Sequence, residues 1–366
     1  MTGYRHGGDI YRNKVDIDCS VSINPMDWPY ELKQRIGIIL GDMSNIHTYP
    51  DITYDGLRAA VARYTDEPLQ SVVCGNGASE LISSICNLVS PRRLMLTAPC
   101  YSGYERAAAA AGADVLYAYT DGKKGYADTD VILECLEGHY GSFSNEDTDM
   151  IIIGNPSNPA GSLIPVDIYE KIVRLCEEKG IVLIVDECFV ELSMSSDEYR
   201  STYSCIRGST LIRLRALTKS FRLAGLRLGY ALFEDEDLAG RLYDFMPEWN
   251  VSTVAMKIGT TCLEYECSLN KAARYMNASY EYIKRERKRV SDTLKGLGIR
   301  VFDSSVNYIL IYSDTDLYEE LLNKKILIRD CKNIVGLNKG YFRISLRDTE
   351  DNDKLIESIR SVIKSL

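Results

Sequence analysis

Short apolar runs rich in β-branched residues alternate with amphipathic stretches through the middle of the chain. The runs expected to be strands are Ser71–Cys74, Arg93–Thr97, Asp114–Tyr119, Met150–Gly154, Ile181–Asp186, Thr210–Leu214 and Gly229–Phe233. Their continuous apolarity indicates a sheet that is covered on both faces. Between them, helical spacing predicts helices such as Val166–Lys179, which ends at Gly180. The alternation therefore predicts an α/β fold with a mostly parallel sheet.

The pattern changes after about residue 250. One long helical segment is expected over Ser252–Leu297, followed by strands at Ile299–Phe302, Tyr308–Tyr312 and Tyr341–Ser345 and a closing helix at Asp351–Ser365. We expect residues 1–45 to form an N-terminal arm and part of a small domain, 46–250 a large α/β domain, and 251–366 a connecting helix and a smaller α+β domain. The polar N-terminal segment is expected to pack on the small domain or on a second subunit.

Composition narrows the possible partners. The 366 residues carry a net charge of −9, which argues against a nucleic-acid or membrane partner, because both need a basic face. A local arginine cluster can still bind a small anion. The eleven scattered cysteines include no C-x-x-C pair and indicate reduced thiols in a cytoplasmic protein. The three histidines lack ligand spacing, so no metal site is expected.

Lys219 directly follows the predicted strand Thr210–Leu214, within Thr218-Lys219-Ser220. Burial at the end of a strand lowers the pKa of an ammonium and makes the amine available for covalent chemistry with a carbonyl group. The alternative is a lysine that extends from a loop into solvent. Asp186 ends another buried run, where a carboxylate needs a cationic partner. That partner is either a protonated pyridine nitrogen or an arginine.

Two further segments follow predicted strands. Asn155-Pro156-Ser157-Asn158-Pro159-Ala160-Gly161 predicts a rigid turn at the carboxyl end of a strand, where open α/β sheets bind ligands. Cys74-Gly75-Asn76-Gly77-Ala78-Ser79-Glu80 leads from a strand into a helix, whose free N–H groups suit a phosphate. Glu80 stands where a dinucleotide fingerprint has its third glycine, which favours one phosphate over a pyrophosphate.

In this order, over Ser22 to Arg347, the motifs resemble the fold-type I pyridoxal-phosphate enzymes of the class I/II aminotransferase group. The resemblance implies the aspartate aminotransferase-like fold and the cofactor pyridoxal 5′-phosphate. It implies that Lys219 is the Schiff-base lysine and that the chain forms a homodimer with shared active sites. The cofactor-binding residues implied are Asp186 at the pyridine nitrogen, Asn158 at the 3-oxygen, Tyr101 stacked on the ring, Ala78, Ser79, Thr218 and Arg227 at the phosphate, and Tyr49 reaching the phosphate of the neighbouring subunit.

Two positions depart from the group's usual pattern. Ala216 stands where a serine or threonine usually helps to bind the phosphate. Phe189 stands where aminotransferases usually have a tyrosine that donates to the 3-oxygen. Neither departure removes the cofactor, but Phe189 weakens the interpretation as a plain aminotransferase.

The ends of the chain bear on the reaction. Arg343 matches the arginine that binds the substrate α-carboxylate throughout the group. Arg329 and the N-terminal His6-Gly7-Gly8 resemble the threonine-phosphate decarboxylases, although Asp9 stands where that family often has asparagine. We hypothesise that His6, Arg329, Arg343 and Arg347 together bind a phosphorylated amino acid at its two anionic ends. For the arginines the alternative is surface ion pairing, and for His6 it is a flexible terminus.

These residues predict decarboxylation of an O-phosphorylated amino acid, with L-threonine-O-3-phosphate as the expected substrate and aminopropanol phosphate as the product. One alternative is an aminotransferase of the histidinol-phosphate type, which would use the same cofactor residues. The other is a non-catalytic, aminotransferase-like effector domain of a regulator. One methyl group changes binding by only about 1–3 kcal/mol, so the sequence does not rank phosphothreonine against phosphoserine.

Overall fold

The computed structural model describes residues 6–122, 130–139 and 148–364. Its larger sheet has seven strands in the order β2-β8-β7-β6-β5-β3-β4. Their bounds are β2 Val72–Gly75, β3 Arg93–Ala98, β4 Asp114–Tyr119, β5 Met150–Gly154, β6 Val182–Asp186, β7 Leu211–Ala216 and β8 Gly229–Phe233. β8 runs antiparallel to both of its neighbours, β2 and β7, and the other pairs among these strands are parallel. The predicted α/β fold class with a mostly parallel sheet is confirmed, and every predicted strand lies within about two residues of its observed bounds.

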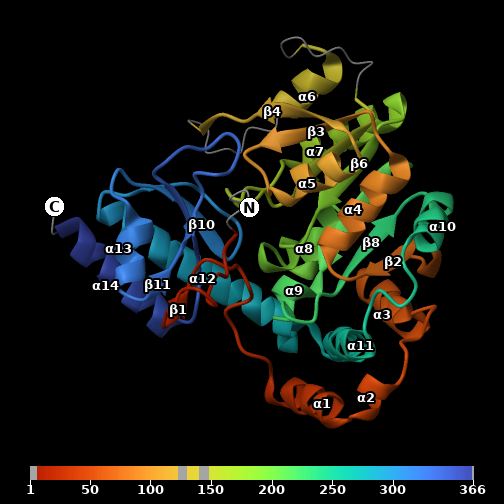
Figure 1. Ribbon diagram of the computed structural model, residues 1–366, viewed down its shortest axis with the longest axis horizontal. Coiled ribbons are helices and arrows are strands. Elements are labelled where there is room, and N and C mark those ends of the chain that lie inside the picture. Colours follow the sequence, from red (N-terminus) through yellow and green to blue (C-terminus); the bar gives the residue numbers. More distant parts are fainter. Residues whose placement is uncertain (1–5, 123–129, 140–147, 365–366) are drawn as a thin grey trace.

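Helices cover both faces of this sheet (Figure 1). The helices of this part of the chain are α3 Asp55–Thr65, α4 Ala78–Val89, α5 Gly103–Ala110, α6 Asp130–Glu137, α7 Val166–Lys179, α8 Ser196–Thr202, α9 Leu217–Ser220 and α10 Glu236–Phe245. Two separate apolar clusters result, one under α6 and α7 and the other under α4 and α5. Burial on both faces explains why the strands are apolar throughout instead of alternating.

A second, antiparallel sheet of four strands has the order β12-β13-β10-β9. Its strands are β9 Arg300–Val301, β10 Tyr308–Tyr312, β12 Arg329–Asp330 and β13 Tyr341–Ser345, and helices α13 Leu317–Asn323 and α14 Thr349–Lys364 pack beside it. The residue at which we expected the last helix to end, Ser365, lies outside the described residues. β1 Ile17–Asp18 pairs in parallel with β11 Ile326–Leu327, so the N-terminal segment packs on this sheet's part of the chain. Strands of two residues leave little periodic pattern. The sequence predicted β9, as Ile299–Phe302, but not β1, β11 or β12.

The prediction of one helix over Ser252–Leu297 is wrong. The structure has two helices, α11 Thr253–Ser268 and α12 Tyr275–Gly296. The chain turns between them, where the Asn270 side chain accepts a hydrogen bond from the Ala273 N–H group. The buried Glu266 carboxylate then accepts from the N–H groups of Tyr275 and Met276 and caps α12. No glycine or proline marks this break in the sequence. None of the described helices is both long and apolar enough to cross a bilayer.

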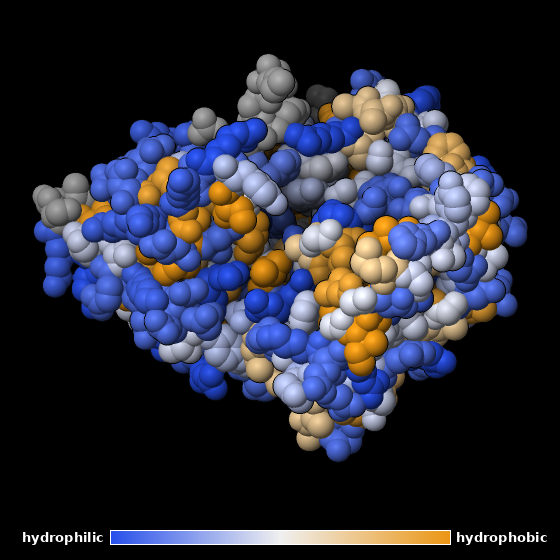
Figure 2. All heavy atoms as spheres, turned by 60° about the horizontal axis from the view of Figure 1, so that its bottom comes forward, coloured by the Kyte–Doolittle hydropathy of each residue, from blue (hydrophilic) through white to orange (hydrophobic). Residues whose placement is uncertain are grey.

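Helices α1 Tyr30–Gly41 and α2 Ser44–His47 lie at one side of the molecule, beside α11 (Figure 1). Several large apolar side chains on and beside them are exposed to solvent, namely Tyr30, Ile38, Leu40, Met43, Ile46 and Tyr49. We call this surface the α1–α2 face. Figure 2 brings this side forward and shows apolar groups near a hollow in the surface. The domain boundaries expected near residues 45 and 251 stay predictions.

Candidate active site

The parallel strands of the large sheet end at a cavity of about 270 Å³. The small sheet closes its other side through β12 and β13. All the predicted site residues except Tyr49 and Arg347 line this cavity: His6, Ala78, Ser79, Tyr101, Asn158, Asp186, Thr218, Lys219, Arg227, Arg329 and Arg343. Segments that are far apart in the sequence therefore supply one site.

Lys219 lies on α9, the single helical turn that begins directly after β7. The backbone N–H group of Asn24 donates to the Lys219 carbonyl oxygen at 2.9 Å and so links the N-terminal segment to this turn. The Lys219 Nζ atom lies 5.8 Å from the centre of the Phe189 ring. Burial lowers the pKa of Lys219, and the positive charges of Arg343 and Arg227 lower it further. The cavity thus favours a neutral amine, as the sequence predicted.

Asp186 ends β6 and presents its carboxylate to the cavity with both oxygens positioned by hydrogen bonds. The buried Tyr104 hydroxyl donates to Oδ2 at 2.6 Å, and the Cys188 N–H group donates to Oδ1 at 3.0 Å. Sequence reasoning missed Tyr104. Its position three residues after Tyr101, in the first turn of α5, was the available signal.

Asn158 and Arg343 meet although 185 residues separate them. Arg343 Nη1 donates to Asn158 Oδ1 at 2.6 Å, and Nη2 donates to the Ser20 carbonyl oxygen at 3.0 Å. Because the amide oxygen of Asn158 is engaged in this way, its Nδ2 is the atom that remains to donate to a ligand. Arg343 therefore sets the orientation of the Asn158 side chain.

Ala78 and Ser79 begin α4, where the first N–H groups of a helix have no partner inside the helix. Glycines keep this end open. A Cβ atom on Gly229 would lie 2.7 Å from the Ala78 nitrogen, and one on Gly77 would lie 3.0 Å from Arg227 Nη2. Gly77 also has a φ of +81°, which favours glycine. Free N–H groups, an arginine and small residues form an anion site of the predicted kind.

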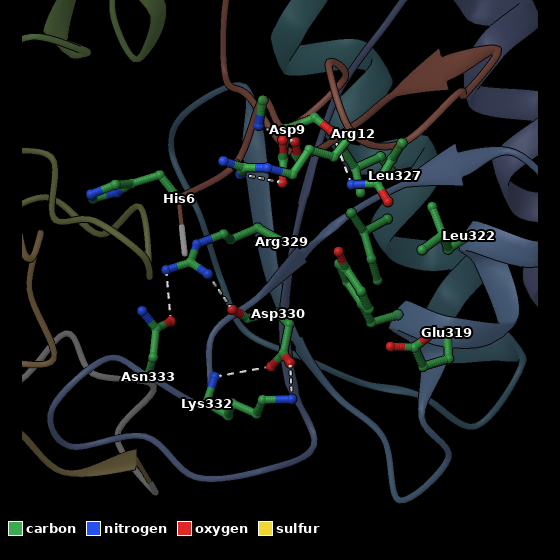
Figure 3. Close-up of a pocket in the computed structure, with 16 residues that line it drawn as sticks. His6, Asp9, Arg12, Glu319, Leu322, Leu327, Arg329, Asp330, Lys332 and Asn333 are labelled. Atoms are coloured by element: carbon green, nitrogen blue, oxygen red, sulfur yellow. Dashed lines mark hydrogen bonds and ion pairs between the residues drawn. The ribbon is translucent and has the colours of Figure 1, made fainter. Parts of the chain in front are cut away.

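Arg329 and Arg343 are direct partners across the antiparallel pair β12–β13. Their acceptors in the described part of the chain are uncharged: the Asp330 carbonyl and the Asn333 amide oxygen for Arg329, and the Ser20 carbonyl and the Asn158 amide oxygen for Arg343. Figure 3 shows the Arg329 guanidinium between His6 and Asn333. Like charges directly opposite each other are destabilising, so this pair has a cost that an anionic ligand would remove.

His6, Gly7, Ser20 and Arg329 also line an adjoining cavity of about 700 Å³ between the N-terminal arm and the small sheet. The imidazole of His6 lies 6.0 Å from the Tyr101 ring, measured between centroids. Burial lowers the pKa of His6, and Arg106, Arg329 and Arg343 lower it further. Asp9 faces this outer cavity and pairs with Arg12 at 3.2 Å.

Tyr49 and Arg347 do not line the central cavity. Tyr49 is 77% exposed, and its ring lies 4.9 Å from that of Trp249. The backbone of Arg347 is bonded to the Asn352 side chain at the start of α14. The chain therefore does not bring these two residues to its own site.

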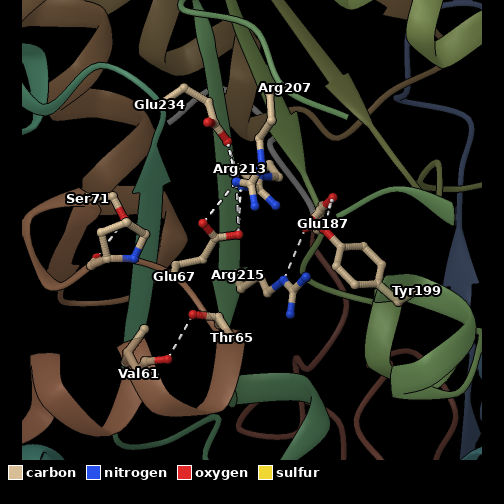
Figure 4. A network of polar contacts seen from close by, with 11 residues as sticks. Val61, Thr65, Glu67, Ser71, Glu187, Tyr199, Arg207, Arg213, Arg215 and Glu234 are labelled. Atoms are coloured by element: carbon tan, nitrogen blue, oxygen red, sulfur yellow. Dashed lines mark hydrogen bonds and ion pairs between the residues drawn. The ribbon is translucent and has the colours of Figure 1, made fainter. Parts of the chain in front are cut away.

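Behind the cavity, a buried ion pair joins β7, which precedes Lys219, to the residue that follows Asp186 at the end of β6 (Figure 4). Glu187, next to Asp186, accepts hydrogen bonds from Arg215 Nε at 3.0 Å and from the Tyr199 hydroxyl at 2.8 Å. The Arg215 guanidinium lies 4.3 Å from the centre of the Tyr199 ring. This network could not be predicted from the sequence, because its members come from three separate segments of the chain.

The residues present fit pyridoxal phosphate. The cavity offers an amine whose pKa is lowered by burial, helix N–H groups beside an arginine, an oriented amide donor and a carboxylate that would face a pyridine nitrogen. The Tyr101 ring has the room it needs only because residue 103 is glycine, since a Cβ atom there would lie 2.1 Å from Tyr101 Cε1. Two donors hold the Asp186 carboxylate, but no cationic side chain among the described residues bonds to it. A pyridine nitrogen would supply the missing cationic partner.

Known proteins resemble this chain over almost its whole length. Residues 22–359 match the family described as aminotransferase class I and II. A threonine-phosphate decarboxylase of Salmonella typhimurium is 29% identical, with 99% of this chain and 97% of that protein covered. The solved histidinol-phosphate aminotransferase from Clostridium acetobutylicum is also 29% identical, with 96% of this chain and 100% of that one covered and a TM-score of 0.81.

A third similar protein is the solved histidinol-phosphate aminotransferase from Sinorhizobium meliloti in complex with pyridoxal-5′-phosphate. It is 19% identical, covers 96% of this chain and 92% of its own, and has a TM-score of 0.80, which supports the fold. The match over residues 22–359 includes every strand of the large sheet. The chain belongs to the class I and II aminotransferase family and is a pyridoxal-phosphate-dependent enzyme of fold type I.

Proposed function

We propose that this enzyme decarboxylates an O-phosphorylated amino acid, with L-threonine-O-3-phosphate as the first substrate to test. The observation that carries the proposal is the cross-strand pair Arg329–Arg343, which has no carboxylate partner among the described residues. Two guanidinium groups at one cavity favour a ligand with two anionic groups. An amino-acid phosphate has both an α-carboxylate and a phosphate. The name of the Salmonella relative supports the choice.

In this proposal the protein decides which bond at Cα breaks. Pyridoxal phosphate held in the cavity would supply an electron-accepting ring for a bond at Cα. Arg329 and His6 would hold the phosphate end of the substrate and Arg343 the carboxylate end. This two-point anchoring would fix how the substrate is presented to the cofactor and would favour loss of CO₂ over loss of the Cα proton.

The remaining residues would position the reacting groups and move protons. Lys219 would hold the cofactor covalently. Once the substrate amine has displaced it, Lys219 would take up the proton that this amine gives up and, because burial lowers the pKa of Lys219, would return that proton to Cα. Asp186 would face the ring nitrogen, held there by Tyr104 and Cys188. Asn158 would donate from Nδ2 to the 3-oxygen without help from residue 189, which is phenylalanine.

A direct assay tests the reaction. The cofactor-loaded enzyme is incubated with phosphothreonine and no oxo acid, and CO₂ and aminopropanol phosphate are measured. We expect both products in equal amounts, and neither from Lys219→Ala. Turnover that requires 2-oxoglutarate would instead establish an aminotransferase.

That aminotransferase is the second candidate function. The 29% identity to a histidinol-phosphate aminotransferase and its TM-score of 0.81 favour it, and such an enzyme would need the same cofactor residues. Histidinol phosphate has an alcohol in place of the carboxylate. A competition assay with the two phosphorylated compounds would therefore show whether the Arg343 end of the cavity selects a carboxylate.

We also propose a homodimer in which Tyr49 serves the neighbouring site. The α1–α2 face exposes large apolar side chains, such as Ile46 at 67% exposure, and a patch of this kind marks an interaction surface. Tyr49 lies on the same surface and away from its own cavity. Sedimentation should show a dimer, and Ile46→Glu should weaken both the dimer and cofactor retention. A wild-type monomer that binds the cofactor fully would contradict this arrangement.

A further inference from the structure

Glu80 is an unexpected residue beside an anion site. It lies in the first turn of α4, two residues after Ala78, where a carboxylate would repel a bound phosphate. In the structure its Oε2 atom instead accepts two hydrogen bonds. The Asn76 N–H group donates at 2.6 Å, and Asn250 Nδ2 donates at 2.6 Å. The carboxylate is therefore held by the loop that precedes α4 and by a residue that is distant in the sequence.

The contacts continue away from the cavity. The Tyr54 hydroxyl donates to Asn250 Oδ1, so the two ends of the Asn250 amide join Tyr54 to Glu80. Tyr54 is buried and precedes α3. Both Tyr54 and Trp249 have a positive φ, at 54° and 55°, which is rare for residues other than glycine. The surrounding structure thus keeps these two segments in unfavourable backbone conformations.

These contacts restrict the loop between β2 and α4, which we call the phosphate loop. Asn76 and Gly77 connect β2, which ends at Gly75, to α4, and two glycines in three residues allow many backbone conformations. The N–H groups of Ala78 and Ser79 can bind a phosphate tightly only if this loop is already fixed, because ordering it during binding costs affinity. The bond from Asn76 to Glu80 fixes the loop, and Asn250 and Tyr54 fix Glu80.

We propose that Glu80, Asn250 and Tyr54 are positioning residues that hold the phosphate loop ready for the cofactor. We call this set the loop brace. Asn250 is its central member, because its amide donates to Glu80 and accepts from Tyr54 at once. An aspartate at position 250 would face Glu80 with a second negative charge. The proposal rests on the cofactor of the family and not on the proposed decarboxylation.

The test measures cofactor binding to the full-length apoenzyme. We expect Asn250→Ala to raise the dissociation constant of pyridoxal phosphate about tenfold, since a hydrogen bond to a charged group is lost. Asn250→Asp should raise it further, and Glu80→Gln and Tyr54→Phe should raise it less. The rise in melting temperature on adding the cofactor should shrink in the same order. A ³¹P NMR signal from the bound cofactor should broaden or shift as the loop loses its fixed conformation.

Asn352→Ala is the matched control. Asn352 is a fully buried asparagine that donates to a buried glutamate, Glu286, at 3.0 Å, far from the phosphate loop along the chain and on the other sheet's side. The Asn352→Ala substitution should lower the melting temperatures of the apoenzyme and holoenzyme equally and leave cofactor affinity unchanged. If Asn250→Ala behaves in this way, or keeps its cofactor affinity within about twofold of wild type, the proposal is overturned. Should Asn250→Ala fail to fold, Glu80→Gln is judged by the same criterion.

Discussion

Two groups of arginines in this enzyme differ in what neutralises them. Arg213 lies in the centre of β7, and its Nη2 atom donates to Glu67 at 2.9 Å and to Glu234 at 2.7 Å (Figure 4). Arg215, on the same strand, pairs with Glu187. Arg329 and Arg343 donate hydrogen bonds only to carbonyl and amide oxygens in the described part of the chain. The first group is balanced by carboxylates, and the second has no bonded carboxylate among the described residues.

The difference between the two arginine groups shows how an acidic protein can still have a cavity that suits an anion. The net charge of −9 is a sum over the whole chain, and it does not describe the cavity. A buried charge without a counter-charge costs stability, so a protein that keeps one is arranged for a partner. The four predictions below test this difference, from the largest expected effect to the smallest.

Arg213→Met should destabilise the fold by about 3–5 kcal/mol, because the buried Glu67 and the partly buried Glu234 would keep only the half-exposed Arg207 as a partner. Denaturant unfolding of the apoenzyme measures this. Arg207→Met removes a half-exposed member of the same network and should cost much less. Cofactor affinity should be preserved in both variants. A fully stable Arg213→Met protein would show that the network is dispensable.

Arg343→Met should have the opposite profile. We expect little loss of stability but a fall of about 10²–10³-fold in kcat/KM for phosphothreonine, since a charged hydrogen-bond partner of the substrate is removed. Arg329→Met should mainly raise KM. Arg347→Met is the matched comparison, because the structure keeps that arginine out of the cavity, and its effect should be the smallest of the three. If Arg347→Met lowers kcat/KM as much as Arg343→Met does, Arg347 also binds the substrate.

Glu266 is the acidic counterpart, a buried carboxylate whose bonding partners are backbone N–H groups. Burial raises its pKa from the usual 4.5 to about 7. Since folding raises this pKa, the stability linked to Glu266 is fully present below about pH 4.5 and is lost as the pH rises to about 7. Glu266→Gln should therefore be more stable than wild type by about 1–3 kcal/mol at about pH 8 and similar at about pH 4.5. Thermal melts across this range test the sign.

His6 should give the smallest effect, a change of less than about tenfold in affinity. Its pKa is lowered by burial and by neighbouring arginines, so it is neutral at pH 7, and a bound anion would favour its protonated form. Affinity should therefore rise as the pH falls through 6.5 and below. Threonine O-sulfate is the suitable inhibitor, because its sulfate charge is constant over this range. His6→Asn should abolish this pH dependence of affinity. If the pH dependence persists in His6→Asn, His6 is not its source.

Sequence reasoning found most of the site because each strand carries its chemistry at its end. Lys219, Asp186 and Asn158 follow continuous apolar runs, and parallel strands bring their carboxyl ends to one edge. It missed Tyr104, Glu187 and Asn250, because their roles come from partners on other elements. It also joined α11 and α12, because the turn between them depends on the Asn270 and Glu266 side chains and contains no helix-breaking residue.

By itself, the sequence determined the α/β class and the order of the strands along the chain, since these depend on local periodicity, and its short motifs predicted residues that line one cavity. Only the tertiary structure decided which charges are balanced. Arg213 and Arg343 look alike in the sequence, each within an apolar run. One packs against Glu67 from another part of the chain, and the other faces Arg329 across a strand pair. Electrostatic energy depends on distances in space, which the order of residues does not contain.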